Sequence, residues 1–108
     1  APATANTMAK MVAGITDNML MAVYLSARSK VFIAPTMDLD MYQHPSTQRN
    51  IDTLKSWGHK ILEPNTGALA SGLEGAGRMQ EPEELFAALE SHFKKKTPLV
   101  NYRVLVSA

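Results

Sequence analysis

The chain has 108 residues, a length that allows one domain. Hydrophobic residues make up 45% of it and charged residues 19%, which excludes a disordered chain. Eleven Lys and Arg residues against ten Asp and Glu residues leave a net charge of +1, so we expect no nucleic-acid partner. Cysteine is absent and no apolar run approaches ~20 residues, so we expect a cytoplasmic protein without disulfides, thiolate metal sites or a membrane span.

A capped helix is predicted near the start of the chain. Thr4, Asn6 and Thr7 each offer an oxygen that can accept from a free N–H group of the first helical turn. Apolar residues then recur at the spacing of one helix face, at Met8, Met11, Val12, Ile15, Met19 and Val23. We therefore expect a single helix over residues 7–27, with this stripe buried.

A buried strand and a second helix follow. The continuous apolar run at 31–34 predicts a strand buried on both faces, as in a parallel sheet, and residues 36–45 predict a loop. Ser46 or Thr47 is expected to cap the second helix, which ends at Gly58. Its buried face consists of Ile51, Leu54 and Trp57.

The last third of the chain predicts two strands, a long loop and a helix. Residues 60–62 form a short apolar run that predicts a strand. Four glycines make residues 65–80 a long loop, and such loops within compact domains are usually functional. A helix is expected to begin at residues 81–84, with a buried stripe formed by Leu85, Phe86, Leu89 and Phe93. Residues 102–106 predict a final strand.

The alternation of helices and strands indicates an α/β fold with a parallel sheet. Two or three strands make a poor parallel sheet, and no strand precedes the first predicted helix. The sequence therefore predicts the second half of a larger α/β domain.

The first two candidate sites lie at a helix start and after a buried strand. The small residues at 1–7 would let a ligand approach the free N–H groups of the helix, although simple helix capping explains the same pattern. Asp38 and Asp40 follow the strand at 31–34, and ligands of open α/β sheets bind beyond the carboxyl ends of strands. Two carboxylates could bind a cation or act as acid and base. Exposed carboxylates are more often merely solvated, and further ligands are lacking nearby, so we expect no metal site.

A third candidate site is the glycine-rich segment at 67–79. Its Arg78 could bind a phosphate or carboxylate through the planar guanidinium, whereas the alternative is a mobile surface loop. The segment lacks dinucleotide-binding spacing and the Lys-[Ser/Thr] ending of a phosphate loop. Ser71 has no partner base that the sequence identifies, so a hydrolase triad is unsupported. Three histidines lack metal-ligand spacing and are expected to be structural or solvated: His44, His59 and His92.

Together, these three segments resemble the homo-oligomeric flavin-containing cysteine decarboxylases. A-P-A-T-A-N-T resembles the P-A-S-A-N-T motif of that family, and A-P-T-M-D-L-D-M-Y resembles its P-x-M-N-x-x-M-W motif. L-A-S-G-L-E-G-A-G-R-M resembles its substrate-recognition clamp, which usually contains A-C-G-D or A-C-G-E followed by G-R-M. The order and separations match from residue 1 to about residue 93. The similarity is greatest to the phosphopantothenoylcysteine decarboxylases, in which a phosphopantothenate–cysteine ligase follows.

The resemblance implies a fold, a cofactor and a reaction. It implies the C-terminal half of a flavodoxin-like (Rossmann-like) three-layer α/β domain with a parallel sheet, at residues 1–96. Residues 97–108 would be a linker and the first strand of a ligase-like domain. The family binds FMN and assembles as homo-oligomers, trimers or multiples of trimers. Its substrate is 4′-phosphopantothenoylcysteine, whose cysteinyl unit is oxidised by FMN, loses CO₂ and is reduced again to give 4′-phosphopantetheine.

The same resemblance implies roles for individual residues. Cofactor contacts fall on Ala3, Thr4, Ala5 and Asn6, catalytic roles on Asn6 and Ser71, and substrate contacts on Asp38, Met41, Ala70, Gly72 and Arg78. No metal is implied. The family's phosphate-binding loop and active-site His lie upstream of the first motif and are not in this sequence.

Three positions depart from the family pattern. Asp38 stands in place of Asn and, when ionised, cannot donate a hydrogen bond to a substrate carboxylate. Tyr42 replaces Trp and keeps an aromatic wall, and Ser71 replaces the Cys that acts as proton donor. Because this Cys is absent, an alternative function is that of a peptidyl-cysteine decarboxylase, which stops at the oxidised product. A non-catalytic regulatory subunit with the same fold is a further alternative.

Overall fold

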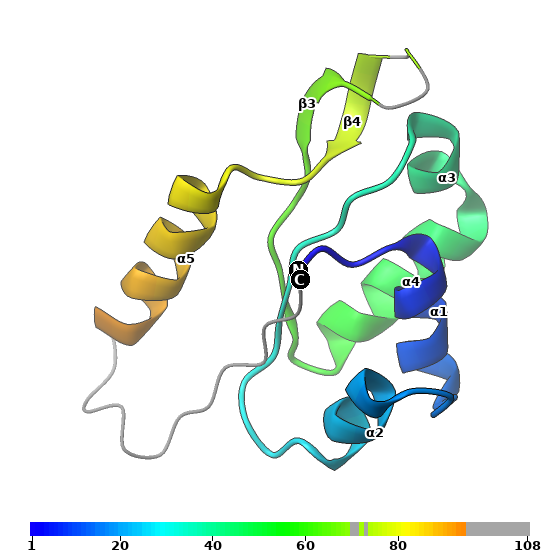
Figure 1. The fold of residues 1–108 in the computed structure, drawn as a ribbon, viewed down its shortest axis with the longest axis vertical. Helices are drawn as coiled ribbons and strands as arrows, with labels where there is room; N and C mark the ends of the chain where they lie inside the picture. Colours follow the sequence, from blue (N-terminus) through cyan, green and yellow to red (C-terminus); the bar gives the residue numbers. More distant parts are fainter. Residues whose placement is uncertain (70–71, 73, 95–108) are drawn as a thin grey trace.

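The computed structural model describes residues 1–69, 72 and 74–94 (Figure 1). The helices are α1 (Ala5–Ala13), α2 (Met19–Ser26), α3 (Leu39–Gln43), α4 (Pro45–Ser56) and α5 (Pro82–Lys94). The strands are β1 (Phe32–Ile33), β2 (Lys60–Ile61), β3 (Asn65–Ala68) and β4 (Glu74–Arg78). None of these helices has the length and apolar character that crossing a membrane requires.

A parallel sheet lies at the centre of the fold. β1 and β2 pair in parallel, with Phe32 opposite Lys60 and Ile33 opposite Ile61. On the other side of β1 the chain at Ala3 forms a parallel bridge with Pro35. The predicted strands at 31–34 and 60–62 and their parallel pairing are confirmed. The segment around Ala3 is an extended stretch before the first helix, where the sequence predicts no strand.

Helices cover both faces of this sheet, which confirms three layers. One core cluster joins α1, α2 and α4 to the sheet through Met8, Met21, Ile33, Leu54 and other buried side chains. A second cluster on the opposite face joins Phe32, Ala34 and Leu62 to Leu85, Ala88 and Leu89, of which the last three lie on α5. Figure 1 shows α5 on one side of the strands and the other long helices on the opposite side.

The single helix predicted over residues 7–27 is wrong, because the chain turns between α1 and α2. Gly14 ends α1 with a φ of +74°, and its N–H donates to the Lys10 carbonyl at 2.8 Å. Asn18 then caps α2 by accepting from the Met21 N–H at 2.9 Å. The predicted stripe fails beyond this break, since Ile15, Met19 and Val23 are 48%, 82% and 44% exposed.

The predicted loop at 36–45 contains the short helix α3, and the cap of α4 is also corrected. Neither Ser46 nor Thr47 is the cap; the ring of His44 accepts from the Ser46 N–H at 3.1 Å, and α4 begins with a proline. Of the predicted face of α4, Ile51 and Leu54 are buried, whereas Trp57 is 52% exposed.

The predicted loop at 65–80 is largely a β-hairpin. β3 and β4 pair antiparallel, with Gly67 opposite Gly75, and the register shifts between Asn65 and Thr66. α5 is confirmed, and Leu85 and Leu89 pack on the sheet as expected, but Phe86 is 66% exposed. The strand predicted at 102–106 and the ligase-like segment at 97–108 lie outside the described residues.

His59 links α2 to the turn before β2 and makes stability depend on pH. Its Nε2 lies 2.7 Å from the Tyr24 hydroxyl, and a neutral ring can accept from that hydroxyl. Burial lowers the pKa of His59 below its ordinary 6.5, and the charge of Lys30 lowers it further. Since the unfolded chain then binds the proton more tightly, the stabilisation is complete above pH 6.5 and is lost as the pH falls toward the folded-state pKa.

The measurement is the melting temperature of the full-length protein at a series of pH values, compared with the same series for His59→Gln. We expect the wild type to lose more stability than the variant as the pH falls below 6.5. Parallel curves for the two proteins would contradict this role of His59.

Candidate functional site

Main-chain hydrogen bonds join the three motif segments at the carboxyl end of β1. The Ala3 N–H donates to the Ala34 carbonyl at 2.8 Å, and the Ala3 carbonyl accepts from the Thr36 N–H at 3.0 Å. Four residues past β1, the Met37 N–H donates to the Gly77 carbonyl at 2.8 Å. The start of α1, the loop before α3 and the β3–β4 hairpin therefore meet at one place. In an α/β sheet this is the edge at which ligands bind.

The first segment presents polar groups beside a small buried residue. Ala3 is only 6% exposed, so the chain here is packed closely against β1. Thr4 caps α1 by accepting from the Thr7 N–H at 3.1 Å, which confirms the capping prediction. Asn6 lies in the first turn of α1 with its side chain exposed, next to the half-buried Ala5. A ligand contact by these residues stays a prediction.

In the second segment, Asp38 lies just before α3 and Met41 lies on it. Asp38 is the half-buried N-cap residue of α3, and Met41 is 49% exposed. Asp40 is exposed in the first turn of α3. Tyr42 is half-buried against the first core cluster, and its hydroxyl donates to Glu63 Oε2 at 3.3 Å. Tyr42 is thus a packing residue as well as the predicted aromatic wall.

The hairpin approaches the second segment closely at two of its glycines. A Cβ atom at Gly77 would overlap the carbonyl oxygen of Met37, and one at Gly75 would lie 2.9 Å from Leu39 Cδ1. Both glycines have positive φ values, of +141° and +154°. In the sequence these glycines predict a loop, and no sequence pattern signals the close contact of Gly77 with Met37.

The predicted substrate residues of the hairpin are only partly placed. Arg78 is exposed, and its guanidinium donates to Glu81 Oε1 at 3.2 Å, so it forms an ion pair with a neighbour. Gly72 is exposed with a φ of +89°. Ala70 and Ser71 lie outside the described residues. The substrate roles of Arg78, Gly72 and Ala70 and the catalytic role of Ser71 stay predictions.

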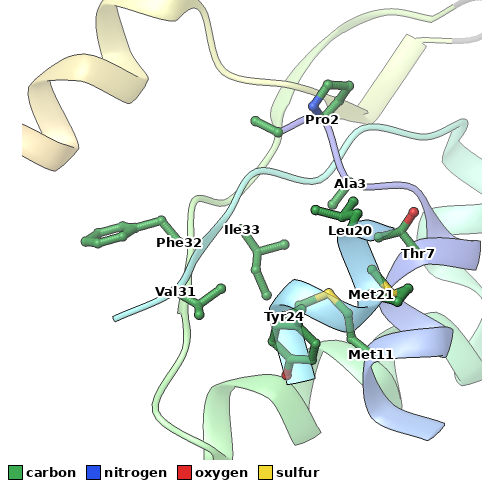
Figure 2. Close-up of a pocket in the computed structure, with 11 residues that line it drawn as sticks. Pro2, Ala3, Thr7, Met11, Leu20, Met21, Tyr24, Val31, Phe32 and Ile33 are labelled. Atoms are coloured by element: carbon green, nitrogen blue, oxygen red, sulfur yellow. The ribbon is translucent and has the colours of Figure 1, made fainter. Parts of the chain in front are cut away.

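A small hollow lies beside the sheet, away from the hairpin. It lies between α1, α2, β1 and the first three residues, and has a volume of about 30 Å³ (Figure 2). Its lining is mostly apolar and includes Ala3, Met11, Leu20, Tyr24 and Ile33. This volume suits a water molecule and is far below that of a cofactor pocket. The hollow is therefore a packing feature.

In the described part of the chain, no group of three His, Asp or Glu side chains is arranged to hold a metal ion. Asp38 is the N-cap of α3 and Asp40 lies in its first turn, and among the described residues they belong to no such group of three. His44 is a helix cap, and His59 and His92 form edge-on ring contacts with Tyr24 and Phe32.

Known proteins resemble the chain along its whole length. A cysteine/cysteine sulfinic acid decarboxylase from an unknown prokaryotic organism is 58% identical over 112 residues, which cover 100% of this chain and 31% of the relative. The coenzyme A biosynthesis bifunctional protein CoaBC of Bacillus subtilis strain 168 is 44% identical over 110 residues, which cover 100% of this chain and 27% of the relative. The chain spans less than a third of the length of these relatives.

Solved structures share the fold. A cysteine-to-serine mutant of PPC decarboxylase, complexed with pantothenoylaminoethenethiol, matches with a TM-score of 0.85 and 31% identity, covering 87% of this chain and 53% of that one. The FMN binding protein AtHal3 matches with a TM-score of 0.80 and 28% identity, covering 90% and 54%. These matches confirm the predicted α/β fold, of which this chain forms about half. A family model described as Flavoprotein matches residues 1–94, and the chain belongs to the Flavoprotein family.

Proposed function

We propose that this chain is part of an FMN-dependent decarboxylase that removes CO₂ from the cysteine end of 4′-phosphopantothenoylcysteine. The observation that carries the proposal is the meeting of the three motif segments through main-chain hydrogen bonds at the carboxyl end of β1. The CoaBC relatives and the similarity to PPC decarboxylase support this substrate. The product would be 4′-phosphopantetheine, an intermediate of coenzyme A biosynthesis.

The described residues fit one edge of a flavin ring. Ala3 and Ala5 are small, so a planar ring can approach the backbone, and the exposed Thr4 and Asn6 can hydrogen-bond to its polar edge. When bound, FMN supplies the hydride transfer that makes loss of the carboxyl group easy. The described residues provide contacts to one edge of the flavin ring only. We therefore expect FMN to bind tightly only to the full-length protein.

The chain's own groups would bind and orient the substrate. The Asn6 amide can donate a hydrogen bond to the substrate carboxylate from the first turn of α1. The β3–β4 hairpin, held against Met37, would cover the substrate. The Ser71 hydroxyl is the candidate proton donor, directly or through water, although it is a far weaker acid than a thiol.

The full-length protein tests the proposal directly. It should purify with the absorption spectrum of bound FMN and release CO₂ from 4′-phosphopantothenoylcysteine. A single turnover analysed by mass should give phosphopantetheine. A product two hydrogens lighter would contradict complete turnover and would support an oxidative, peptidyl-cysteine type of decarboxylase. A colourless protein that takes up no flavin would overturn the proposal in favour of a non-catalytic subunit.

A second candidate function is decarboxylation of free cysteine or cysteine sulfinic acid. The relative that is 58% identical carries that name, and it favours this candidate over a peptide substrate. The two candidates differ in whether the cysteine nitrogen is acylated. Comparing kcat/KM for cysteine, cysteine sulfinic acid and 4′-phosphopantothenoylcysteine decides between them, and we expect the acylated substrate to give the highest value.

Replacing Asp38 by Asn is expected to change kcat/KM several-fold. An ionised Asp38 carboxylate repels a substrate carboxylate, whereas an Asn amide can donate a hydrogen bond to it. The measurement is kcat/KM for wild type and Asp38→Asn at one near-neutral pH, with Asp40→Asn as the control for loss of one charge at the start of α3. Identical values for wild type and Asp38→Asn would remove Asp38 from the site.

We also propose that the protein is a homo-oligomer, a trimer or a multiple of trimers. α2 is apolar on all sides, and side chains along and just before it are 44% to 82% exposed: Ile15, Met19, Val23 and Leu25. A helix of this kind is typically buried in a larger assembly. Light scattering on the full-length protein is expected to give three protomers or a multiple of three, and a monomer would contradict the proposal.

A further inference from the structure

Glu63, which lies between β2 and β3, contacts three other segments of the chain. Its Oε1 lies 2.6 Å from Lys55 Nζ of α4, and its Oε2 accepts from the Tyr42 hydroxyl of α3 at 3.3 Å. Its main-chain carbonyl accepts from Gln80 Nε2 at 2.9 Å. Sequence motifs did not single out Glu63, Lys55 or Gln80. These residues nevertheless connect α3, α4 and both ends of the hairpin.

The contacts of Glu63 place it at the base of the β3–β4 hairpin. Asn65 and Arg78 are the outermost residue pair of the hairpin, and Glu63 and Gln80 lie two residues beyond them on either side. The hydrogen bond from Gln80 therefore closes the hairpin base. The carboxylate of Glu63 points from this base to Tyr42 in α3.

α3 is thus attached to the hairpin near both of its ends. Before the helix, the Met37 N–H donates to the Gly77 carbonyl. In its last turn, Tyr42 reaches Glu63 through its hydroxyl, while the Tyr42 carbonyl accepts from Gln48 of α4 at 2.6 Å. Two separated attachments fix the orientation of a short helix as well as its position.

The protonation states of Tyr42 and Lys55 are consistent with their contacts to Glu63. Burial raises the pKa of Tyr42, and the Glu63 carboxylate raises it further, so the phenol stays a donor at neutral pH. The hydrogen bond to Glu63 raises the pKa of Lys55, which keeps that ammonium charged. Both side chains of the ion pair are about half exposed, so its contribution to global stability is small.

We propose that Glu63 is a positioning residue. It holds α3 against the hairpin by accepting a hydrogen bond from the Tyr42 hydroxyl, and so tunes the affinity for substrate. The link to substrate affinity rests on the proposed function, in which these two elements line the substrate site. Neither Glu63 nor Tyr42 is expected to touch the reacting atoms. Loss of the contact should therefore weaken substrate binding and leave the chemical step nearly unchanged.

The experiment compares Glu63→Ala, Glu63→Gln and Tyr42→Phe in the full-length protein. The first readout is hydrogen exchange of the segment 36–42, which contains the Met37 amide that is bonded to Gly77. We expect exchange about threefold faster in Glu63→Ala and Tyr42→Phe. The double variant should show no further increase over Glu63→Ala, because both substitutions remove the same Tyr42–Glu63 hydrogen bond. Glu63→Gln keeps an oxygen that can accept from Tyr42, and it should stay within about 1.5-fold of wild type.

The second readout is steady-state kinetics with 4′-phosphopantothenoylcysteine. KM should rise about threefold in Glu63→Ala and Tyr42→Phe, with kcat within about twofold of wild type. Glu90→Gln is the matched control, since it breaks an exposed ion pair of the same 2.6 Å length, to Lys94 on α5, without touching α3 or the hairpin. It should leave both readouts unchanged.

Two results would overturn the inference. Unchanged exchange at 36–42 in both contact-breaking variants would show that Glu63 does not hold α3. A fall in kcat with no change in KM would show that its role is not in substrate binding. If the wild type decarboxylates no cysteine derivative, the proposed function fails, and the exchange readout still decides whether Glu63 positions α3.

Discussion

Replacing Gly77 by Ala is expected to separate the hairpin from the loop before α3. The added methyl group would overlap the main-chain oxygen of Met37. Its near neighbours are all backbone atoms, so no flexible side chain can move away to make room. The φ of +141° is also unfavourable for any residue with a Cβ. We expect a loss of about 1–3 kcal/mol, shown by a lower melting temperature, and a fall of at least about tenfold in kcat/KM.

Gly14→Ala is the matched control for this substitution. Gly14 also has a positive φ, of +74°, but nothing lies within 4 Å of the position that its Cβ would take. The control therefore carries the backbone strain without the overlap, and it lies far along the chain from the hairpin. Kinetic losses of equal size in Gly14→Ala and Gly77→Ala would show that the contact with Met37 is unimportant for the site.

Replacing Asn6 by Ala is expected to abolish most activity without weakening the fold. Asn6 is exposed in the first turn of α1, and Ala is favourable within a helix, so the melting temperature should change little. If its amide donates to the substrate carboxylate as proposed, the loss of this donor should lower kcat by about 10²-fold or more. The measurements are CO₂ release at saturating substrate and the melting temperature of the same preparation.

Asn6→Asp separates the donor from the size of the side chain. The carboxylate keeps the shape of the amide but cannot donate when ionised, so it should be as inactive as Asn6→Ala. The FMN absorbance of each variant shows whether flavin is still bound. An Asn6→Ala protein with wild-type turnover and bound FMN would exclude Asn6 from catalysis.

The central sheet and α5 could be predicted from the sequence because each has a local signal. The run at 31–34 is apolar at every position, and those four residues are all buried in the structure. The acidic start of α5 and its half-buried Leu85 and Leu89 follow ordinary helix patterns. Such elements depend mainly on neighbours in the chain or on burial alone.

Other elements were missed because competing signals were stronger or more distant. Gly14 interrupted a helical pattern that continued in the sequence up to Val23, and only the turn and the cap at Asn18 show that the helix ends. The hairpin strands are rich in glycine and lack alternating apolar residues, so their sequence predicts a loop. Their stability depends on contacts with the loop before α3, about 40 residues earlier in the chain.

The candidate site also combines features that the sequence predicts with contacts that it does not. The three segments were identified by motifs, and the structure brings them together. The pairing of Met37 with Gly77 and of Tyr42 with Glu63 could not be predicted, since each joins residues at least 21 positions apart that carry no shared pattern.

The joins between the segments at the end of β1 are made by peptide groups rather than by side chains. Ala3, Ala34, Thr36 and Met37 contribute only N–H and C=O groups to these hydrogen bonds, and every amino acid except proline can supply both. Substitutions at exposed positions of α3, such as Asp40 and Met41, would therefore alter the surface presented to a ligand while the scaffold stays in place. This architecture makes the site evolvable, because substrate preference can drift by single substitutions without refolding of the backbone.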